Sequence, residues 1–178
     1  NTVFSLIGGT LNFTNNTFIG GGTSYQIMDI QPQTGNYQVT GGTVNLNLPG
    51  AGTAYSINST APIYNLNISN RTGTNTTTIR WTTPASELTV LNDLTLGAGS
   101  VLDLGTNTIG LTVGHNFTLP AGSTYTPGNN TTTFNGTGGQ IFTNAGTITS
   151  GLNNFTVSNH SNTTITSALA IRGTLAIN

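Results

Sequence analysis

The sequence contains no cysteine and few charged residues. Without cysteine, neither a disulfide framework nor a thiolate metal site can form. Charged residues make up 4% of the chain, and only three residues are Lys or Arg. A chain with a formal net charge of -1 has too little positive charge to neutralise a row of phosphates or to hold an anionic bilayer surface. These absences argue against nucleic-acid partners, and the lack of a long apolar run argues against membrane insertion.

Signals for helix are also missing, because no segment keeps a 3.6-residue apolar period and the strong helix formers Glu, Lys and Gln are scarce. What is abundant is Thr and Asn, which together make up about a third of the chain, alongside 34% hydrophobic residues. Disordered chains usually combine high net charge with little apolar patterning. The patterning here is dense, so a folded domain is expected.

The apolar residues alternate with Thr or Asn in short runs that end at Gly, Asn, Pro or Ser. One face of each run is therefore apolar and the other is uncharged and polar, as in half-buried β-strands. Such runs occur along nearly the whole chain, and examples are Val44–Leu48, Tyr64–Ile68, Leu94–Leu96, Leu102–Leu104, Leu111–Val113, Phe117–Leu119, Phe155–Val157 and Leu175–Ile177. The sequence predicts an all-β protein.

The spacing of the runs indicates how the strands are arranged. From Leu88 onward a strand candidate begins about every five to eight residues, so three strands and their turns take about 20 residues. That length suits one coil of a three-sided solenoid, in which each coil pairs with the next at the ordinary inter-strand distance. We therefore expect a parallel right-handed β-solenoid with about 20 residues per coil. A two-sheet β-sandwich is the alternative that the sequence leaves open.

A longer repeat overlies this pattern, since the segment Asn65–Asn70 recurs as Asn154–Asn159. We predict a single domain over residues 1–178, with internal modules at 41–127 and 128–178, the second of them truncated. The strand pattern is cut off at both ends of the sequence, and neither end supplies the polar cap that a solenoid needs. The expectation is a fragment of a longer protein or a subunit whose ends are covered by neighbours.

Three segments together resemble a known kind of repeat: Thr133–Ile141, Leu152–Asn159 and Leu169–Asn178. They are similar to repeats of giant cell-surface proteins of Bacteroidetes-type bacteria that the type IX secretion system exports. The resemblance extends over about Thr43 to Asn178. It implies a stalk or filament segment of an adhesin or gliding-associated protein, located outside the cell or on its surface. The departures are Trp81 with its flanks and the segment from Tyr25 to Tyr37, where a binding surface is expected.

The ionisable residues offer little for catalysis or metal binding. Asp93 and Asp103 are the candidate pair of acids, but ten residues are about half a coil and would place them on different faces. His115 and His160 lie in turn motifs, without a second His at metal-ligand spacing. The sequence therefore predicts no enzyme activity, no catalytic residue, no metal and no cofactor.

Two kinds of carbohydrate contact are candidates. Trp81, Arg80 and Tyr64 are the candidates for a sugar-stacking surface, although such side chains more often fill a core. The candidate glycosylation acceptors, which begin Asn-x-Ser/Thr triplets, are Asn12, Asn58, Asn70, Asn75, Asn116 and Asn135. Alternating strands place positions i and i+2 on one face, which raises the number of such triplets without any glycan.

The function that these features favour is a non-catalytic structural or adhesive segment of a large extracellular surface protein or filament, acting as a stiff stalk or surface-binding fibre. The expected partners are neighbouring repeats of the same chain, further copies of itself, and surface glycans. The alternatives are a β-helical polysaccharide-active enzyme and a carbohydrate-binding module.

Overall fold

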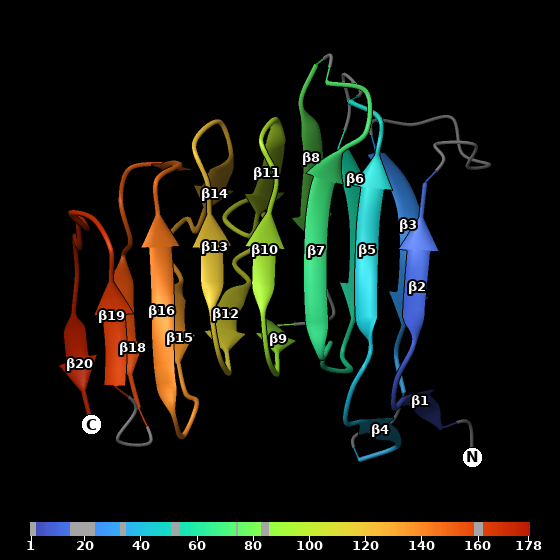
Figure 1. Cartoon of the computed structure of the whole chain (residues 1–178), viewed down its shortest axis with the longest axis horizontal. Coiled ribbons are helices and arrows are strands. Elements are labelled where there is room, and N and C mark those ends of the chain that lie inside the picture. The colour runs from blue at the N-terminus through green and yellow to red at the C-terminus, as the bar shows by residue number, and fades with distance from the viewer. Residues whose placement is uncertain are drawn as a thin grey trace.

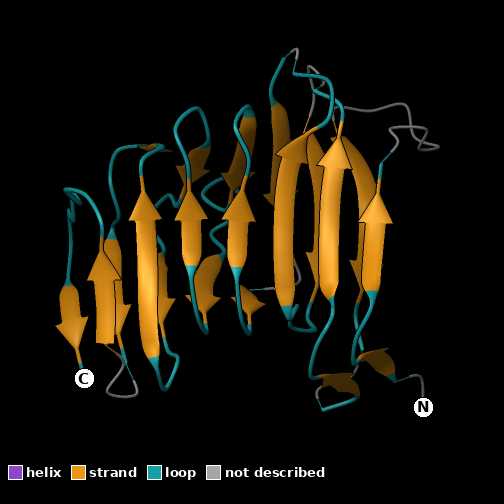
Figure 2. Cartoon of the chain, viewed as in Figure 1, coloured by secondary structure: helices purple, strands orange, loops and turns teal. Residues whose placement is uncertain are grey.

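The computed structural model describes residues 3–14, 24–32, 35–50, 54–73, 75–82, 86–158 and 162–178. This part of the chain contains strands and no helix. Most of the strands form three parallel sheets that run side by side along one axis (Figures 1 and 2). In Figure 1 the front strands point up, the strands behind them point down, and the chain advances from right to left, so the winding is right-handed.

Each turn of the chain contributes a strand to successive sheets. The first sheet, at the front of Figure 1, consists of β2 (Thr10–Phe13), β5 (Thr43–Leu48), β7 (Asn65–Asn70), β10 (Leu94–Leu96), β13 (Phe117–Leu119), β16 (Gly139–Asn144) and β19 (Asn162–Ile165). The second sheet consists of β3 (Ser24–Ile30), β6 (Ala54–Ser59), β8 (Thr77–Trp81), β11 (Ser100–Asp103), β14 (Thr124–Thr126) and β17 (Thr147–Ile148). The third sheet consists of β9 (Glu87–Val90), β12 (Gly110–Val113), β15 (Thr131–Phe134), β18 (Asn154–Val157) and β20 (Leu175–Ile177). A separate pair is formed by β1 (Phe4–Leu6) and β4 (Tyr37–Val39).

The strand pairing confirms the predicted parallel right-handed β-solenoid and excludes the β-sandwich, because neighbouring strands are parallel and lie in successive turns. One turn takes about 23 residues. This is slightly more than the predicted 20, because corner segments such as 104–109 add residues between the second and third sheets.

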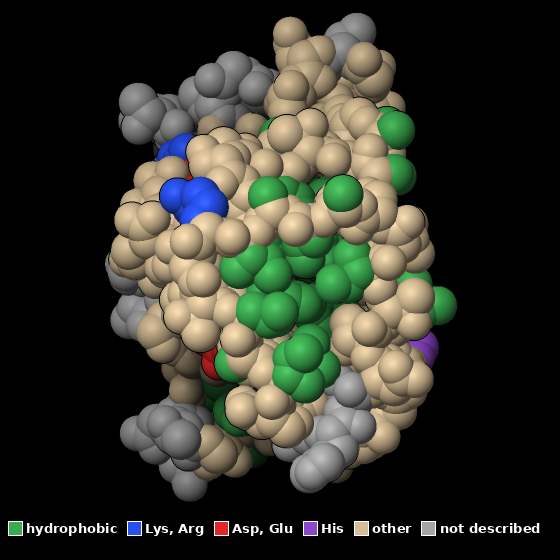
Figure 3. Space-filling model, turned by 90° about the vertical axis from the view of Figure 1, so that its left-hand side faces the viewer, with side chains coloured by type: hydrophobic (Ala, Val, Ile, Leu, Met, Phe, Trp, Pro, Cys, Tyr) green, Lys and Arg blue, Asp and Glu red, His purple; other side chains and the backbone are tan. Residues whose placement is uncertain are grey.

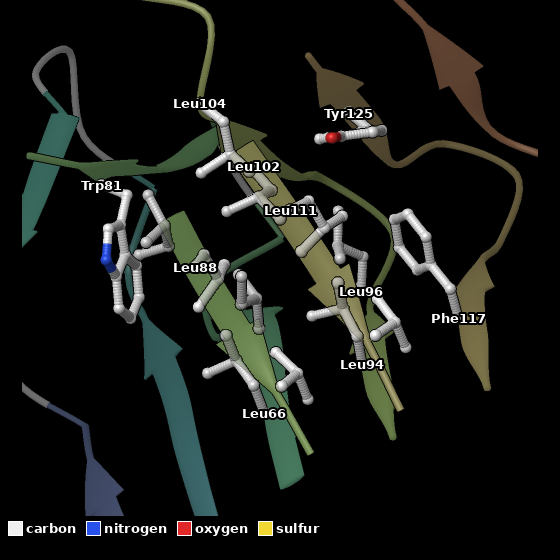
Figure 4. Close-up of a cluster of buried hydrophobic side chains, with 14 of the residues drawn as sticks. Leu66, Trp81, Leu88, Leu94, Leu96, Leu102, Leu104, Leu111, Phe117 and Tyr125 are labelled. Atoms are coloured by element: carbon white, nitrogen blue, oxygen red, sulfur yellow. The ribbon is translucent and has the colours of Figure 1, made fainter. Parts of the chain in front are cut away.

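The core lies inside the solenoid, because the apolar residues of each alternating strand point inward. Side chains at equivalent positions stack from turn to turn, as Leu66, Leu94 and Phe117 do in the first sheet. All three are 0% exposed. Figure 4 shows this packing, with leucines from all three sheets meeting around the same axis. Parallel in-register pairing therefore turns a period of two in the sequence into continuous apolar columns.

Aromatic rings replace leucine in the columns of the later turns. Phe117 stacks on Phe142 with ring centroids 4.9 Å apart, and its edge meets Tyr125 at 5.5 Å. The Tyr125 hydroxyl shares a 2.9 Å hydrogen bond with the hydroxyl of Thr132, which is buried in an otherwise apolar column. Burial raises the pKa of Tyr125 above its ordinary value, and the hydrogen bond from Thr132 opposes this only in part.

The outer face of the first sheet carries a column of asparagines. The Nδ2 atom of Asn45 donates to Oδ1 of Asn12 at 2.8 Å, and Nδ2 of Asn67 donates to Oδ1 of Asn45 at 2.9 Å. Beside it, the hydroxyl of Ser69 donates to Oδ1 of Asn47 at 3.1 Å. Polar side chains thus bond from turn to turn without using charge, which explains how a chain with 4% charged residues keeps a polar surface.

The third side of the solenoid is the side that the third sheet occupies. On this side, strand pairing is interrupted between β4 and the following turn. There Ile63 bridges to Val90, with its N–H donating to the oxygen of Thr89 at 2.9 Å and its oxygen accepting from Leu91 at 2.8 Å. Backbone groups alternate in direction along a parallel strand, so Pro62 faces β4 instead, and proline has no N–H to donate. Among the described residues, β4 accordingly pairs with β1 alone.

The ladders continue across the predicted module boundary, since β13 pairs with β16 and β12 pairs with β15. The described turns therefore share one hydrophobic core. The assignment of residues 1–178 to a single domain, with modules at 41–127 and 128–178, stays a prediction.

Candidate functional site

The three residues of the predicted sugar-stacking surface do not come together. Trp81 is 0% exposed, and its indole points into the core in Figure 4, where Nε1 donates to the backbone oxygen of Ser59 at 3.4 Å. Arg80 precedes it in β8 and points outward, because neighbours in a strand face opposite sides. Tyr64 lies at the corner before β7 and is partly exposed. Trp81 thus drops out of the sugar-binding prediction, since a buried ring has no face for a sugar.

Arg80 instead forms an ion pair with the next turn. Its Nε atom lies 3.0 Å from Oδ2 of Asp103, and the two positions are paired in register. The Asp103 carboxylate also accepts from the backbone and the hydroxyl of Thr106, at 3.1 and 2.7 Å. The partners of this carboxylate among the described residues are thus internal to the solenoid, and the pair joins two turns near the C-terminal ends of two central strands of the second sheet.

Asp93 takes part in a second polar cluster, at the corner before the first sheet. Its Oδ1 atom lies 2.7 Å from Nδ1 of His115 and accepts the N–H of Asn116 at 3.1 Å. The side-chain oxygen of Asn65 accepts the N–H of Asp93 at 3.2 Å, which extends the cluster to the turn before. The side chains of Asp93 and His115 are 40% and 44% exposed, so the corner is open to solvent.

The two acids that were the candidate catalytic pair, Asp93 and Asp103, lie on different sides of the solenoid. Asp103 ends a strand of the second sheet, whereas Asp93 precedes a strand of the first sheet. Within the described residues no three His, Asp or Glu side chains gather as metal ligands. In the same part of the chain, no helix is long and apolar enough to cross a membrane. His160 lies outside the described residues, and the absence of enzyme activity stays a prediction.

The candidate glycosylation acceptors differ in how far they are exposed to solvent. Asn12 and Asn75 are exposed, and Asn75 has a positive φ of 56° in the turn before β8. Asn58 is 5% exposed, and its amide donates to Asp29 at 3.3 Å, so a transferase cannot reach it in the folded chain.

The remaining acceptors are partly exposed. Asn70 donates to the backbone oxygens of Asn75 and Gly99, and its own oxygen accepts the N–H groups of two turn residues. Asn116 accepts the N–H of Ile141 at 2.9 Å. The side-chain amides of Asn70 and Asn116 thus stabilise corners of the solenoid. Asn135 directly follows β15, at another corner. Glycosylation stays a prediction, best placed at Asn12 and Asn75.

A hollow of about 400 Å³ opens where the third side is interrupted. Its lining residues come from β4 and from the next two turns, and they are Tyr37, Gln38, Val39, Thr40, Thr60, Pro62, Thr89 and Leu91. Val39 and Pro62 are buried, whereas Tyr37 is 40% exposed and Leu91 38% exposed. The hollow thus has a buried apolar part and partly exposed apolar side chains at its mouth.

The polar groups of this hollow differ from those of the asparagine column. The side chains of Gln38, Thr40 and Thr89 make no hydrogen bond to any described residue, whereas Thr60 donates to the backbone oxygen of Pro32 at 3.4 Å. The sequence analysis expected a binding surface at the segment from Tyr25 to Tyr37, which reaches the hollow at its last residue, but it assigned no role to Gln38, Thr40 or Thr89. The signal that was available is Pro62, which removes a backbone donor within a run of strands.

The C-terminal end of the solenoid exposes a second apolar surface. Figure 3 shows hydrophobic side chains gathered at the centre of this end, surrounded mostly by backbone and by side chains that are neither hydrophobic nor charged. The last two strands contribute exposed apolar residues here, and these are Ile165 (37%), Leu175 (54%) and Ile177 (74%). The surface is the end of the core, where no further turn covers the columns.

Comparison with known proteins adds no relative to this description. No protein-family model matches the chain, and neither curated proteins nor solved structures give a significant match. The resemblance to type IX secretion repeats therefore stays a prediction, and the fold and the geometry of the surfaces above are what bear on function.

Proposed function

We propose that the chain is a non-catalytic, stiff structural segment of a large extracellular surface protein or filament. The observation that carries the proposal is the unbroken first sheet, in which each strand from β2 to β19 pairs in parallel with the strand of the next turn. Bending such a body requires the strand-to-strand hydrogen bonds of several turns to lengthen together. A stack of this kind suits a role as a spacer.

The sources of stability also suit an extracellular fibre. They are the buried columns and the hydrogen bonds between turns, and neither depends on disulfides or on many ion pairs. The Arg80–Asp103 pair joins only two of the turns. Exposed ion pairs weaken as salt rises, whereas buried apolar contacts and backbone ladders do not. The segment would therefore keep its stiffness across the salt concentrations that a cell surface meets.

The apolar C-terminal end supports the proposed partners. Exposed apolar side chains such as Leu175 and Ile177 lose contact with water when another turn stacks on them. The unpaired edges of β19 and β20 offer backbone groups in the same direction as every other strand of their sheets. We therefore propose that this end is covered by the next repeat of the same chain or by a further copy.

Surface labelling tests the proposal. Antibodies raised against the folded chain are applied to intact, unpermeabilised cells of the source organism and are located by electron microscopy with gold particles. The expected result is gold along filaments or on stalks that project from the surface. A matched control uses permeabilised cells, in which the number of surface-associated particles should not rise.

Labelling that appears only after permeabilisation would refute the extracellular assignment. Labelling at the surface but on compact particles, without an elongated body, would refute the stalk. Release of reducing ends from polysaccharides by the purified chain would favour the enzyme alternative instead.

A further inference from the structure

We propose that the hollow between β4 and the turn that contains Pro62 is a binding site for a neutral sugar, one or two rings in size. The inference goes beyond the proposed stalk and does not depend on it, because a binding site can exist on a fibre or on any other protein. The site is built from Tyr37, Gln38 and Thr40 on one side and from Thr89 and Leu91 on the other.

The volume and the charge of the hollow limit the ligand. Pockets for small ligands measure about 300–1,000 Å³, and this hollow, at about 400 Å³, lies toward the small end of that range. None of the described residues that line it is Asp, Glu, Lys, Arg or His. An anionic or cationic ligand would lose its hydration shell there and gain no opposite charge in return. The ligand is therefore expected to be uncharged.

The chemistry of the walls favours a sugar among uncharged ligands. Tyr37 presents an aromatic ring that is 40% exposed, and a ring with a partly exposed face can pack against the C–H face of a pyranose. Gln38, Thr40 and Thr89 supply an amide and two hydroxyls that bond to no other described residue. A sugar ring needs this combination, because it has one apolar face and a rim of hydroxyls that both donate and accept.

An added peptide strand fits less well, although β4 has an unpaired edge. In the first sheet, β5 and β7 of the same two turns pair directly, so the turns are there about 4.8 Å apart. A strand inserted between β4 and Pro62 would require about twice that spacing. Pro62 would also offer no N–H to such a strand. The hollow is a wedge on one side of the winding and not a gap the width of a strand.

Nuclear magnetic resonance on the isotopically labelled chain, which has a mass of 18.3 kDa, tests the site. The probes are neutral tetrasaccharides of glucose, mannose and galactose, with an oligogalacturonate as the anionic probe. At least one neutral tetrasaccharide should shift the amide signals of Gln38–Thr40 and Thr89–Leu91. The oligogalacturonate should not shift them at comparable concentration.

Two variants and one matched control locate the binding. Tyr37→Ala should weaken binding about tenfold by removing the ring, and Thr89→Val should weaken it about threefold by removing one hydroxyl without changing the shape. Thr95→Val makes the same change as Thr89→Val at a partly exposed residue of β10 that does not line the hollow, and it should leave affinity unchanged. Retention of the remaining amide signals shows that each variant is folded.

Three outcomes would overturn the site: no shift with any of the neutral tetrasaccharides, equal binding of the oligogalacturonate, or an equal loss of affinity in Thr95→Val. Binding of an extended peptide with slowed exchange of the Tyr37 and Val39 amides would assign the hollow to strand addition instead. None of these results would alter surface labelling of a fibre, so the site and the stalk can fail separately.

Discussion

The turns that contain β1 to β8 and the turns from β9 to β18 wind in the same way but differ in regularity. In the later turns, side chains that bond from turn to turn are close to one turn apart, as in the pairs Asp93 with His115, 22 residues apart, and Thr126 with Thr149, 23 residues apart. In the early turns the spacing reaches 33 residues between Asn12 and Asn45, and β3 pairs with β6 across a register shift. The third side is also interrupted here, at Pro62.

This difference shows which part of a solenoid tolerates insertion. Residues on the strand faces must stay in register with the turns on both sides, whereas residues at corners and near an end have fewer neighbours. The early turns use that freedom, and the hollow beside Tyr37 results from it. In the later turns, phenylalanine rings contact one another from turn to turn inside the solenoid. We therefore assign most of the stability to the regular turns, and the hollow lies in the irregular turns.

The largest expected effect compares the core in the two regions. Phe117→Ala should lower the free energy of unfolding by about 3–5 kcal/mol, because Phe117 stacks on Phe142 and its loss leaves a cavity between two turns. Met28→Ala, in the edge strand β3, should cost about 2 kcal/mol, since β3 has a neighbouring strand on one side only. Urea denaturation measures both changes.

An equal or larger loss for Met28→Ala would contradict the assignment of stability to the regular turns. Ile141→Ala serves as the control, because Ile141 is 46% exposed and its truncation should change stability by less than about 0.5 kcal/mol.

A smaller effect is expected from adding one methyl group to a glycine in each region. In the regular turns, a Cβ atom at Gly114 would lie 2.1 Å from the backbone oxygen of Leu91, so Gly114→Ala should cost about 1–3 kcal/mol. In the first turn, Gly8 has no atom within 4 Å of its Cβ position, and Gly8→Ala should leave stability nearly unchanged. Thermal melting compares the two variants. Similar melting temperatures would mean that corners in the regular turns can move apart as easily as those near the end.

The smallest effect concerns the interruption itself. Pro62→Ala restores an N–H group on the side that faces β4, which allows one more hydrogen bond. Alanine also gives the unfolded chain more conformational freedom, and this offsets the gain. The free energy of unfolding should therefore change by less than about 1 kcal/mol. The informative measurement is hydrogen exchange, in which the new amide at position 62 should exchange slowly if proline is what holds the third side open. Pro120→Ala, at a corner of a regular turn, should leave the exchange of its neighbours unchanged. Fast exchange of the new amide would show that the wedge is imposed by packing and not by proline.

Much of the fold was predictable because each strand carries its own pattern. The alternation at Val44–Leu48 and Leu111–Val113 indicated which side chains are buried, and these residues are buried in the structure. The short spacing between runs indicated a solenoid and not hairpins. The corners were less predictable, because a turn of the solenoid can gain residues between two strands without changing the pairing of either strand.

The candidate site was poorly predicted for a physical reason. Trp81 looked suitable for sugar binding by residue type, but the alternation in Thr77–Trp81 turns it inward with Ile79. Tyr37 lies in a short strand, and the hollow beside it is also lined by Pro62, 25 positions later in the chain. No local pattern relates two residues in successive turns.

The sequence by itself determined that this chain is all-β, that each strand has one apolar face, and that its surface is polar without charge, because these properties follow from the residues of one strand at a time. Only the tertiary structure decided which turns lie in close register, which polar side chains bond to one another, and which ones beside Tyr37 form no hydrogen bond to a described residue. Those features depend on the stacking of one turn on the next, and stacking relates residues that lie some 23 positions apart.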